Sequence, residues 1–138
     1  MSSFVFGSVK LNSVAGDFGL LVLRAFAGVS LALAHGLGKL PPPERFVAGV
    51  ANLGFPAPVA FAWLSGLAET VCGLLLAAGL GTRAAAAVIA INMSVAGFLR
   101  HAADPYNAKE LAFLFLAVAV CFLFTGGGRF ALDRLIRK

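Results

Sequence analysis

Two charged side chains stand inside apolar segments that are long enough to cross a membrane. Arg24 lies in the apolar run 18–37, and Glu69 lies in the run 59–80. A charge near the centre of a bilayer costs at least about 2.5 kcal/mol, so each residue needs a partner or a water-filled cavity. Counting residues from the span ends puts both at similar depth, which predicts a buried Arg24–Glu69 ion pair. Such a pair could bind a ligand or exchange protons, or it could only fix helix packing.

Other polar residues gather near one boundary of the predicted spans. His35 follows Arg24 by three helical turns plus about 20°, so both should face the bundle interior. Asn92, in the middle of the run 83–98, is expected to hydrogen-bond across helices. The boundary group forms either the mouth of a site or a polar rim that faces water and headgroups. Its members are His35, Lys39, Glu44, His101 and Glu110.

Metal and thiol chemistry have weaker support. His35, His101, Glu69 and Glu110 could supply metal ligands, but no two of them share a ligand spacing such as His at i and i+4, so we expect no metal. The only cysteines are Cys72 and Cys121, which are predicted to lie at similar depth. They form either a redox pair or simple small-residue packing, and the absence of a CxxC motif favours packing.

The composition excludes an ordinary soluble protein. Of the 138 residues, 60% are hydrophobic and 12% are charged, against roughly 25% charged in soluble domains. The net charge of +5 indicates attraction to anionic lipid and not a nucleic-acid partner. We expect four basic residues near the C-terminus to lie along the cytoplasmic headgroups: Arg129, Arg134, Arg137 and Lys138.

These residues must be positioned by membrane-spanning helices, because an open sheet cannot satisfy its backbone in lipid. We predict an all-α polytopic membrane four-helix bundle, a single domain over 1–138 with spans at about 18–37, 59–80, 83–98 and 108–125. A short helix at about 44–53, between Pro43 and Gly54, reaches only about 15 Å and should be interfacial. Five glycines should permit close helix approach: Gly19, Gly28, Gly66, Gly73 and Gly79.

Charge counts predict the orientation. Four spans put both termini on one side, which then carries six Lys and Arg residues against four on the other side. This bias favours an inner-membrane protein with both termini in the cytoplasm. The six are Lys10, Arg83, Arg129, Arg134, Arg137 and Lys138, and the four are Lys39, Arg45, Arg100 and Lys109.

Several segments in this order resemble the DoxX family of small bacterial membrane proteins, over about Leu20 to Leu135. The resemblance is carried by LRAFAGVSLALAHGLGKL at 23–40, GFPAP at 54–58, AETVCGLLLAAGLGTRAAA at 68–86, Asn92 and Met93, and GGGRFALDRL at 126–135. The family looks like a four-helix membrane bundle. Its recurrent polar positions match Arg24, His35, Lys39, Glu69, Arg83 and Glu110, whereas Gly127 stands where relatives often have Pro.

The resemblance implies a redox-related function. Some relatives look like membrane subunits of thiosulfate:quinone oxidoreductase, and others are associated with oxidative stress or with quinone tolerance. We therefore expect a membrane redox subunit whose polar site binds a quinone-like or small sulfur-containing ligand. Its expected partners are soluble oxidoreductase subunits and further copies of itself. The alternatives are a non-catalytic anchor or scaffold for soluble oxidoreductases and a small permease.

Overall fold

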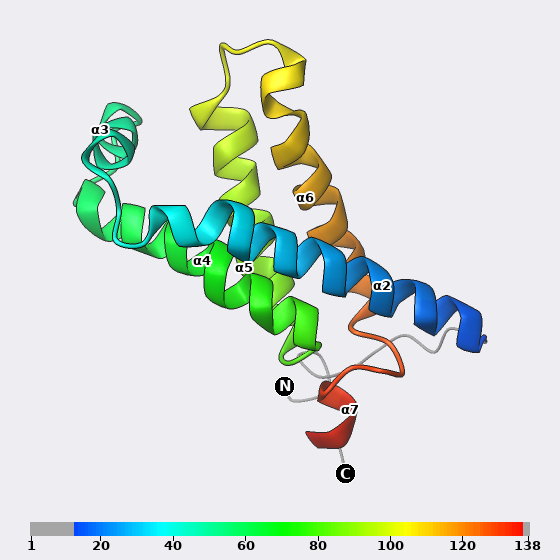
Figure 1. Cartoon of the computed structure of the whole chain (residues 1–138). Helices are drawn as coiled ribbons and strands as arrows, with labels where there is room; N and C mark the ends of the chain where they lie inside the picture. The colour runs from blue at the N-terminus through cyan, green and yellow to red at the C-terminus, as the bar shows by residue number, and fades with distance from the viewer. Residues whose placement is uncertain (1–12, 137–138) are drawn as a thin grey trace.

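The protein is an all-α polytopic membrane protein, as predicted. The computed structural model describes residues 13–136, which form helices and loops (Figure 1). Among these described residues, four helical segments are long and apolar enough to cross a membrane: Val14–Lys39, Pro58–Ala78, Thr82–Arg100 and Tyr106–Thr125. The basic residues Lys10, Arg137 and Lys138 lie outside the described residues.

The first and third spans change helix type near their C-terminal ends. The first is α2 (Val14–Ser30), followed by the π-helix η1 (Leu31–Gly36) and the 3₁₀ turn η2 (Leu37–Lys39). The third is α5 (Thr82–Ser94), followed by the π-helix η3 (Val95–Arg100). The other two spans are the α-helices α4 (Pro58–Ala78) and α6 (Tyr106–Thr125). The first span is therefore longer at both ends than the predicted 18–37.

Local sequence signals set the ends of several helices. The Ser13 hydroxyl accepts a hydrogen bond from the Gly16 N–H at 3.0 Å and caps α2. The short helix α3 (Glu44–Asn52) begins after Pro43 and ends before Gly54, whose φ is 81°. It agrees closely with the predicted interfacial helix. A second short helix, α7 (Asp133–Ile136), was not predicted.

The four spans pack as two antiparallel pairs (Figure 1). The first span packs along α4, and α5 packs along α6, while α4 and α5 join the two pairs. We call the two ends of this bundle the α3 end and the α7 end, after the short helix found at each. The apolar core between the spans includes Leu31, Leu76, Ile89 and Phe122.

The first span and α4 cross at a contact between glycines. A Cβ added to Gly73 would lie 2.8 Å from the Gly28 carbonyl oxygen, and one added to Gly28 would overlap the backbone of α4. Only glycine permits this approach, so the prediction is confirmed here. It is wrong for Gly19, where an added Cβ would meet nothing within 4 Å.

Candidate functional site

A cavity of about 570 Å³ lies at the α3 end, between α3, α4 and the third span. Most of its wall is aliphatic or aromatic, with side chains such as Phe46, Phe55 and Phe61. A few polar groups converge on it, which is the usual composition of a small-molecule site. The polar lining residues are Lys39, Ser65, Glu69, Asn92, Arg100 and His101.

Three of these side chains form one hydrogen-bonded group, the Lys39–Glu69–Asn92 cluster. The Lys39 ammonium donates to both oxygens of the buried Glu69 carboxylate, at 2.6 and 2.7 Å. Asn92 Nδ2 donates to Oε1 of the same carboxylate at 3.0 Å. Each residue comes from a different span, so the cluster also joins three helices. The prediction that Asn92 bonds across helices is confirmed.

The changes of helix type lie next to the residues that reach the cavity. Lys39 ends the η1–η2 segment, Asn92 lies just before η3, and Arg100 ends η3. A π-turn holds more residues than an α-turn, so it rotates the side chains that follow, and such turns are frequent at functional sites. These segments thus bring the ends of two spans towards the cavity.

Helix α3 covers the cluster from the outside. The Phe46 ring centroid lies 5.2 Å from Lys39 Nζ, within cation–π distance. The Arg100 guanidinium reaches across to α3, because a Cβ added to Gly49 would lie 3.4 Å from its Nε. Lys39 keeps 30% of its side chain exposed, whereas Glu69 keeps 3%.

The predicted Arg24–Glu69 pair does not form. Arg24 Nη1 donates to the Ala77 carbonyl of α4, and Nη2 donates to the Phe130 carbonyl at 2.8 Å. Ala77 is eight residues from Glu69, which is roughly 12 Å along a helix. The prediction is wrong because the first span continues to Lys39. That lysine therefore meets Glu69, while Arg24 lies near the opposite end of α4.

Arg24 belongs to a second polar group at the α7 end. The Asp133 carboxylate accepts hydrogen bonds from the N–H groups of Gly81 and Thr82, at 2.6 and 3.0 Å. It also accepts one from the Thr82 hydroxyl at 2.7 Å, and so caps the start of α5. Asp17 accepts the Arg129 N–H at 2.9 Å and lies 3.3 Å from its Nε. The sequence reasoning missed Asp17, Thr82 and Asp133.

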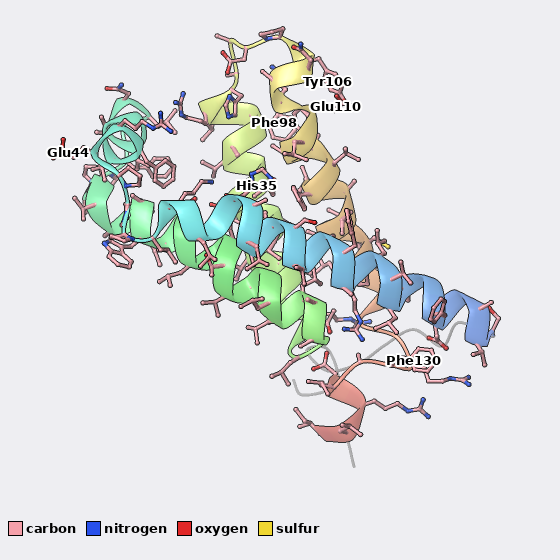
Figure 2. All side chains as sticks on the ribbon, in the orientation of Figure 1. His35, Glu44, Phe98, Tyr106, Glu110 and Phe130 are labelled. Atoms are coloured by element: carbon pink, nitrogen blue, oxygen red, sulfur yellow. The ribbon has the colours of Figure 1, made fainter. Side chains whose placement is uncertain are left out.

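Three other predicted residues lie outside the cavity wall: His35, Glu44 and Glu110. The His35 ring packs edge-on against Phe115, with the ring centroids 5.9 Å apart. Glu110 and Glu44 are exposed, and Figure 2 shows them on opposite sides of the α3 end. His101 does line the cavity, and its Nδ1 lies 2.6 Å from an Asp104 oxygen.

The metal candidates do not come together. Within residues 13–136, no group of three or more His, Cys, Asp and Glu side chains could hold a metal ion. His35, His101, Glu69 and Glu110 therefore do not form a shared set of ligands.

Both cysteines are free thiols. Cys72 and Cys121 form no disulfide with each other; both are half-buried and pack against the apolar core. This packing agrees with the alternative that the absence of a CxxC motif favoured. A redox role for the two thiols stays a prediction.

Comparison with known proteins gives relatives of similar length. An uncharacterized membrane protein of Mycobacterium tuberculosis is 31% identical over 150 residues, which cover 94% of this chain and 88% of the relative. An uncharacterized protein of Haemophilus influenzae is 33% identical over 114 residues, which cover 77% of this chain and 82% of the relative. No solved structure matches the chain.

The sequence pattern of the DoxX family matches residues 19–102. This range runs from α2 through the third span, so it includes all three members of the Lys39–Glu69–Asn92 cluster and the whole of α3. The segments at 23–40, 54–58 and 68–86 that carry the resemblance lie within this range, whereas the segment at 126–135 lies outside it. The chain belongs to the DoxX family of membrane proteins.

Proposed function

We propose that this protein is a membrane subunit of a redox system and binds a quinone-type ligand in the cavity at the α3 end. The observation that carries the proposal is the Lys39–Glu69–Asn92 cluster in the wall of an otherwise apolar cavity. The proposed polar site is thus built on a Lys–Glu pair and not on the Arg–Glu pair expected from the sequence.

The cavity holds hydrogen-bond donors that the protein does not use. The ammonium has three N–H donors and an amide has two, whereas Glu69 takes two bonds from Lys39 and one from Asn92. The Arg100 side chain makes no hydrogen bond or ion pair with any residue between 13 and 136. Both Glu69 oxygens already accept hydrogen bonds. The spare groups are therefore mainly donors, which suit a ligand with carbonyl oxygens.

The rest of the cavity suits the ring of such a ligand. Its volume of about 570 Å³ is within the range of roughly 300–1,000 Å³ usual for small-molecule sites. The Phe46, Phe55 and Phe61 side chains offer aromatic surface for stacking. The carbonyl of a quinone would accept a hydrogen bond from Lys39 or Asn92 while its ring lies against these groups.

The redox role and the partner are supported by the family resemblance. Reduction of a quinone to a hydroquinone takes up two electrons and two protons. We assign the electrons to a soluble oxidoreductase partner, and the task of binding and orienting the ring to this chain. Lys39 is placed to pass a proton to a reduced ligand oxygen, because it is held beside the carboxylate and remains partly exposed.

Direct binding tests the proposal. The full-length protein in lipid nanodiscs is titrated with a ubiquinone analogue that lacks the side chain, and heat is measured by calorimetry. Asn92→Leu should weaken binding by about tenfold, the value of one good hydrogen bond. Lys39→Met combined with Glu69→Gln should weaken binding further, because it removes the ammonium donors of the cavity. This double variant should still fold, because it leaves no buried charge unpaired.

Lys109→Met is the matched control. Lys109 also lies at the α3 end, but its Nζ donates to the Ala102 carbonyl and it does not line the cavity. This variant should bind as the wild type does. If the analogue binds the Lys39→Met, Glu69→Gln protein as tightly as the wild type, the cavity is not its site. If it does not bind the wild type, the proposal fails.

We also propose that the α7 end faces the cytoplasm of a bacterial inner membrane, following the charge bias. With Cys72 and Cys121 replaced by Ala, a cysteine at the exposed Arg134 position should react only from inside. One at the exposed Asn107 position should react only from outside. Labelling of the two positions from the opposite sides would show that the α7 end faces away from the cytoplasm.

A further inference from the structure

The cavity extends along the third span from the membrane boundary to its centre. Arg100 ends the 19-residue span Thr82–Arg100, and Ile91 is its middle residue. At 1.5 Å per residue, the two are roughly 13 Å apart along the axis. Both line the same cavity. The cavity therefore reaches from the boundary to the middle of the bilayer, where Glu69 and Asn92 lie next to the middle residues of α4 and the third span.

The cavity is open on the lipid side, within the membrane-spanning lengths of α4 and α5. Two of its lining side chains, Leu64 of α4 and Ile91, are 59% and 68% exposed. Val88, one turn deeper on α5, is also exposed and lines the cavity. At this depth an exposed side chain meets hydrocarbon and not water. The gap between α4 and α5 thus joins the cavity to the lipid.

The outer part of the cavity is partly covered by α3 and the loop that follows it. Phe46, Val50 and Leu53 of the α3 segment line it, and Val50 is buried. Arg100 reaches across to α3 at the boundary. Figure 1 shows α3 beside the N-terminal end of α4, away from the centre of the bundle. A ligand dissolved in the bilayer therefore meets an apolar opening, whereas one dissolved in water meets α3 and the charged side chains of Lys39 and Arg100.

We propose that the ligand is a membrane-dissolved amphiphile that enters sideways between α4 and α5. Its head group carries acceptor oxygens that bind the donors of the Lys39–Glu69–Asn92 cluster and Arg100. Its hydrocarbon tail leaves past Leu64 and Ile91 into the lipid. This deepens the proposed function, on which it rests, because it restricts the ligand to molecules that have both a polar head and a tail.

Two forms of one head group test the inference. The wild-type protein in nanodiscs is titrated with the ubiquinone analogue that lacks a side chain and with its decyl-tailed form. The same titrations are made with Leu64→Trp and with Ile91→Trp, each of which narrows the opening from one helix. The quantity compared is the ratio of the two affinities. Partitioning of the tailed ligand into the bilayer is the same for every variant, so it cancels.

Each tryptophan variant should weaken binding of the decyl form about tenfold more than it weakens binding of the tailless form, which is the contribution of roughly two methylene groups. Leu67→Trp is the control, because Leu67 is one turn away on α4, 40% exposed and outside the cavity wall. It should change neither affinity. Thermal unfolding of each variant checks that it is folded, and two variants on different helices guard against a single damaged protein.

The outcomes separate the two proposals. Binding of the tailless form, with equal effects of Leu64→Trp on both forms, overturns the lateral route and leaves the quinone proposal intact. Equal effects of Leu64→Trp and Leu67→Trp also overturn it. If neither form binds the wild type, the proposed function itself fails and this inference fails with it.

Discussion

The two ends of the bundle use buried charge in different ways. At the α7 end, Arg24 is 1% exposed and its guanidinium donates to two backbone carbonyls. At the α3 end, Lys39 comes from the same span, but it pairs with another side chain and borders a cavity. A main-chain carbonyl fixed in a helix or a turn cannot turn towards a ligand, whereas side-chain donors can. If the α3 end binds a ligand as proposed, the partner of a buried charge, and not the charge itself, distinguishes a structural role from a binding role.

The α7 end joins distant parts of the chain through carboxylates. Asp133 follows the last span and caps α5, and Asp17 of the first span holds the N–H of Arg129. Arg24 also bonds the carbonyl of Phe130 in this C-terminal segment, which Figure 2 shows beneath the first span. Because these groups bond the backbone, we assign them to stability. Stability and ligand binding should therefore respond separately to changes at the two ends.

The largest expected effect on stability is that of Asp133→Leu. It removes a buried carboxylate that accepts three hydrogen bonds and leaves the first N–H groups of α5 without a partner. We expect the free energy of unfolding to fall by about 3 kcal/mol or more. Chemical unfolding in detergent measures this, while the protein that remains folded should bind the tailless analogue with unchanged affinity.

Asp104→Leu is the matched control at the α3 end. Asp104 also bonds a side chain, that of His101, but 46% of the Asp104 side chain is exposed. We therefore expect Asp104→Leu to lower the free energy of unfolding by less than about 1 kcal/mol. If the two variants lose equal free energy of unfolding, buried carboxylates do not stabilise the α7 end more than exposed ones stabilise the α3 end.

A smaller effect is expected for the coupling between charges. Glu69→Leu should cost about 3 kcal/mol in the wild type, because it leaves the Lys39 ammonium without its carboxylate, but much less when Lys39 is already Met. Glu69→Leu and Arg24→Leu should add to within about 0.5 kcal/mol, since they share no partner. Two double-mutant cycles measure both terms. Strong coupling of Glu69 to Arg24 would support the ion pair predicted from the sequence. It would contradict the separation of the two ends into different sites.

The helices could be predicted from the sequence because their signals are local. Twenty apolar residues in a row indicate a span whatever the rest of the chain does. The interfacial helix followed from Pro43 before it and Gly54 after it, and the structure places both there. Glu69 and Asn92 could be selected as site residues because polar groups inside such runs need partners.

The pairing could not be predicted because it depends on geometry that composition does not carry. The predicted first span ended at residue 37, so Lys39 was placed at its rim, whereas the π-helix and 3₁₀ turn carry the span on to that residue. The cap on α5 joins residues 51 positions apart in the chain. The sequence nevertheless contains one signal that α5 needs a cap from another segment. Gly81 precedes α5 and offers no side-chain cap, so an acceptor had to come from elsewhere.

The smallest effect, that of Arg129→Ala, sharpens the comparison further. The Arg129 side chain is 46% exposed, so water screens its ion pair with Asp17, although the Asp17 side chain itself is buried. Its loss should cost less than about 1 kcal/mol. The main-chain N–H of residue 129 still reaches Asp17 in this variant, because that bond does not need the side chain.

Asp17→Ala, by contrast, removes the acceptor for that N–H and the acidic group in the first turn of α2, and should cost about 1–2 kcal/mol. Unfolding of both variants in the same detergent gives the comparison. If Arg129→Ala costs as much as Asp17→Ala, the ion pair holds the C-terminal segment. The α7 end would then depend on two side chains that hold each other, as the α3 end does, and the distinction between backbone-bound and side-chain-bound charge would no longer separate the two ends.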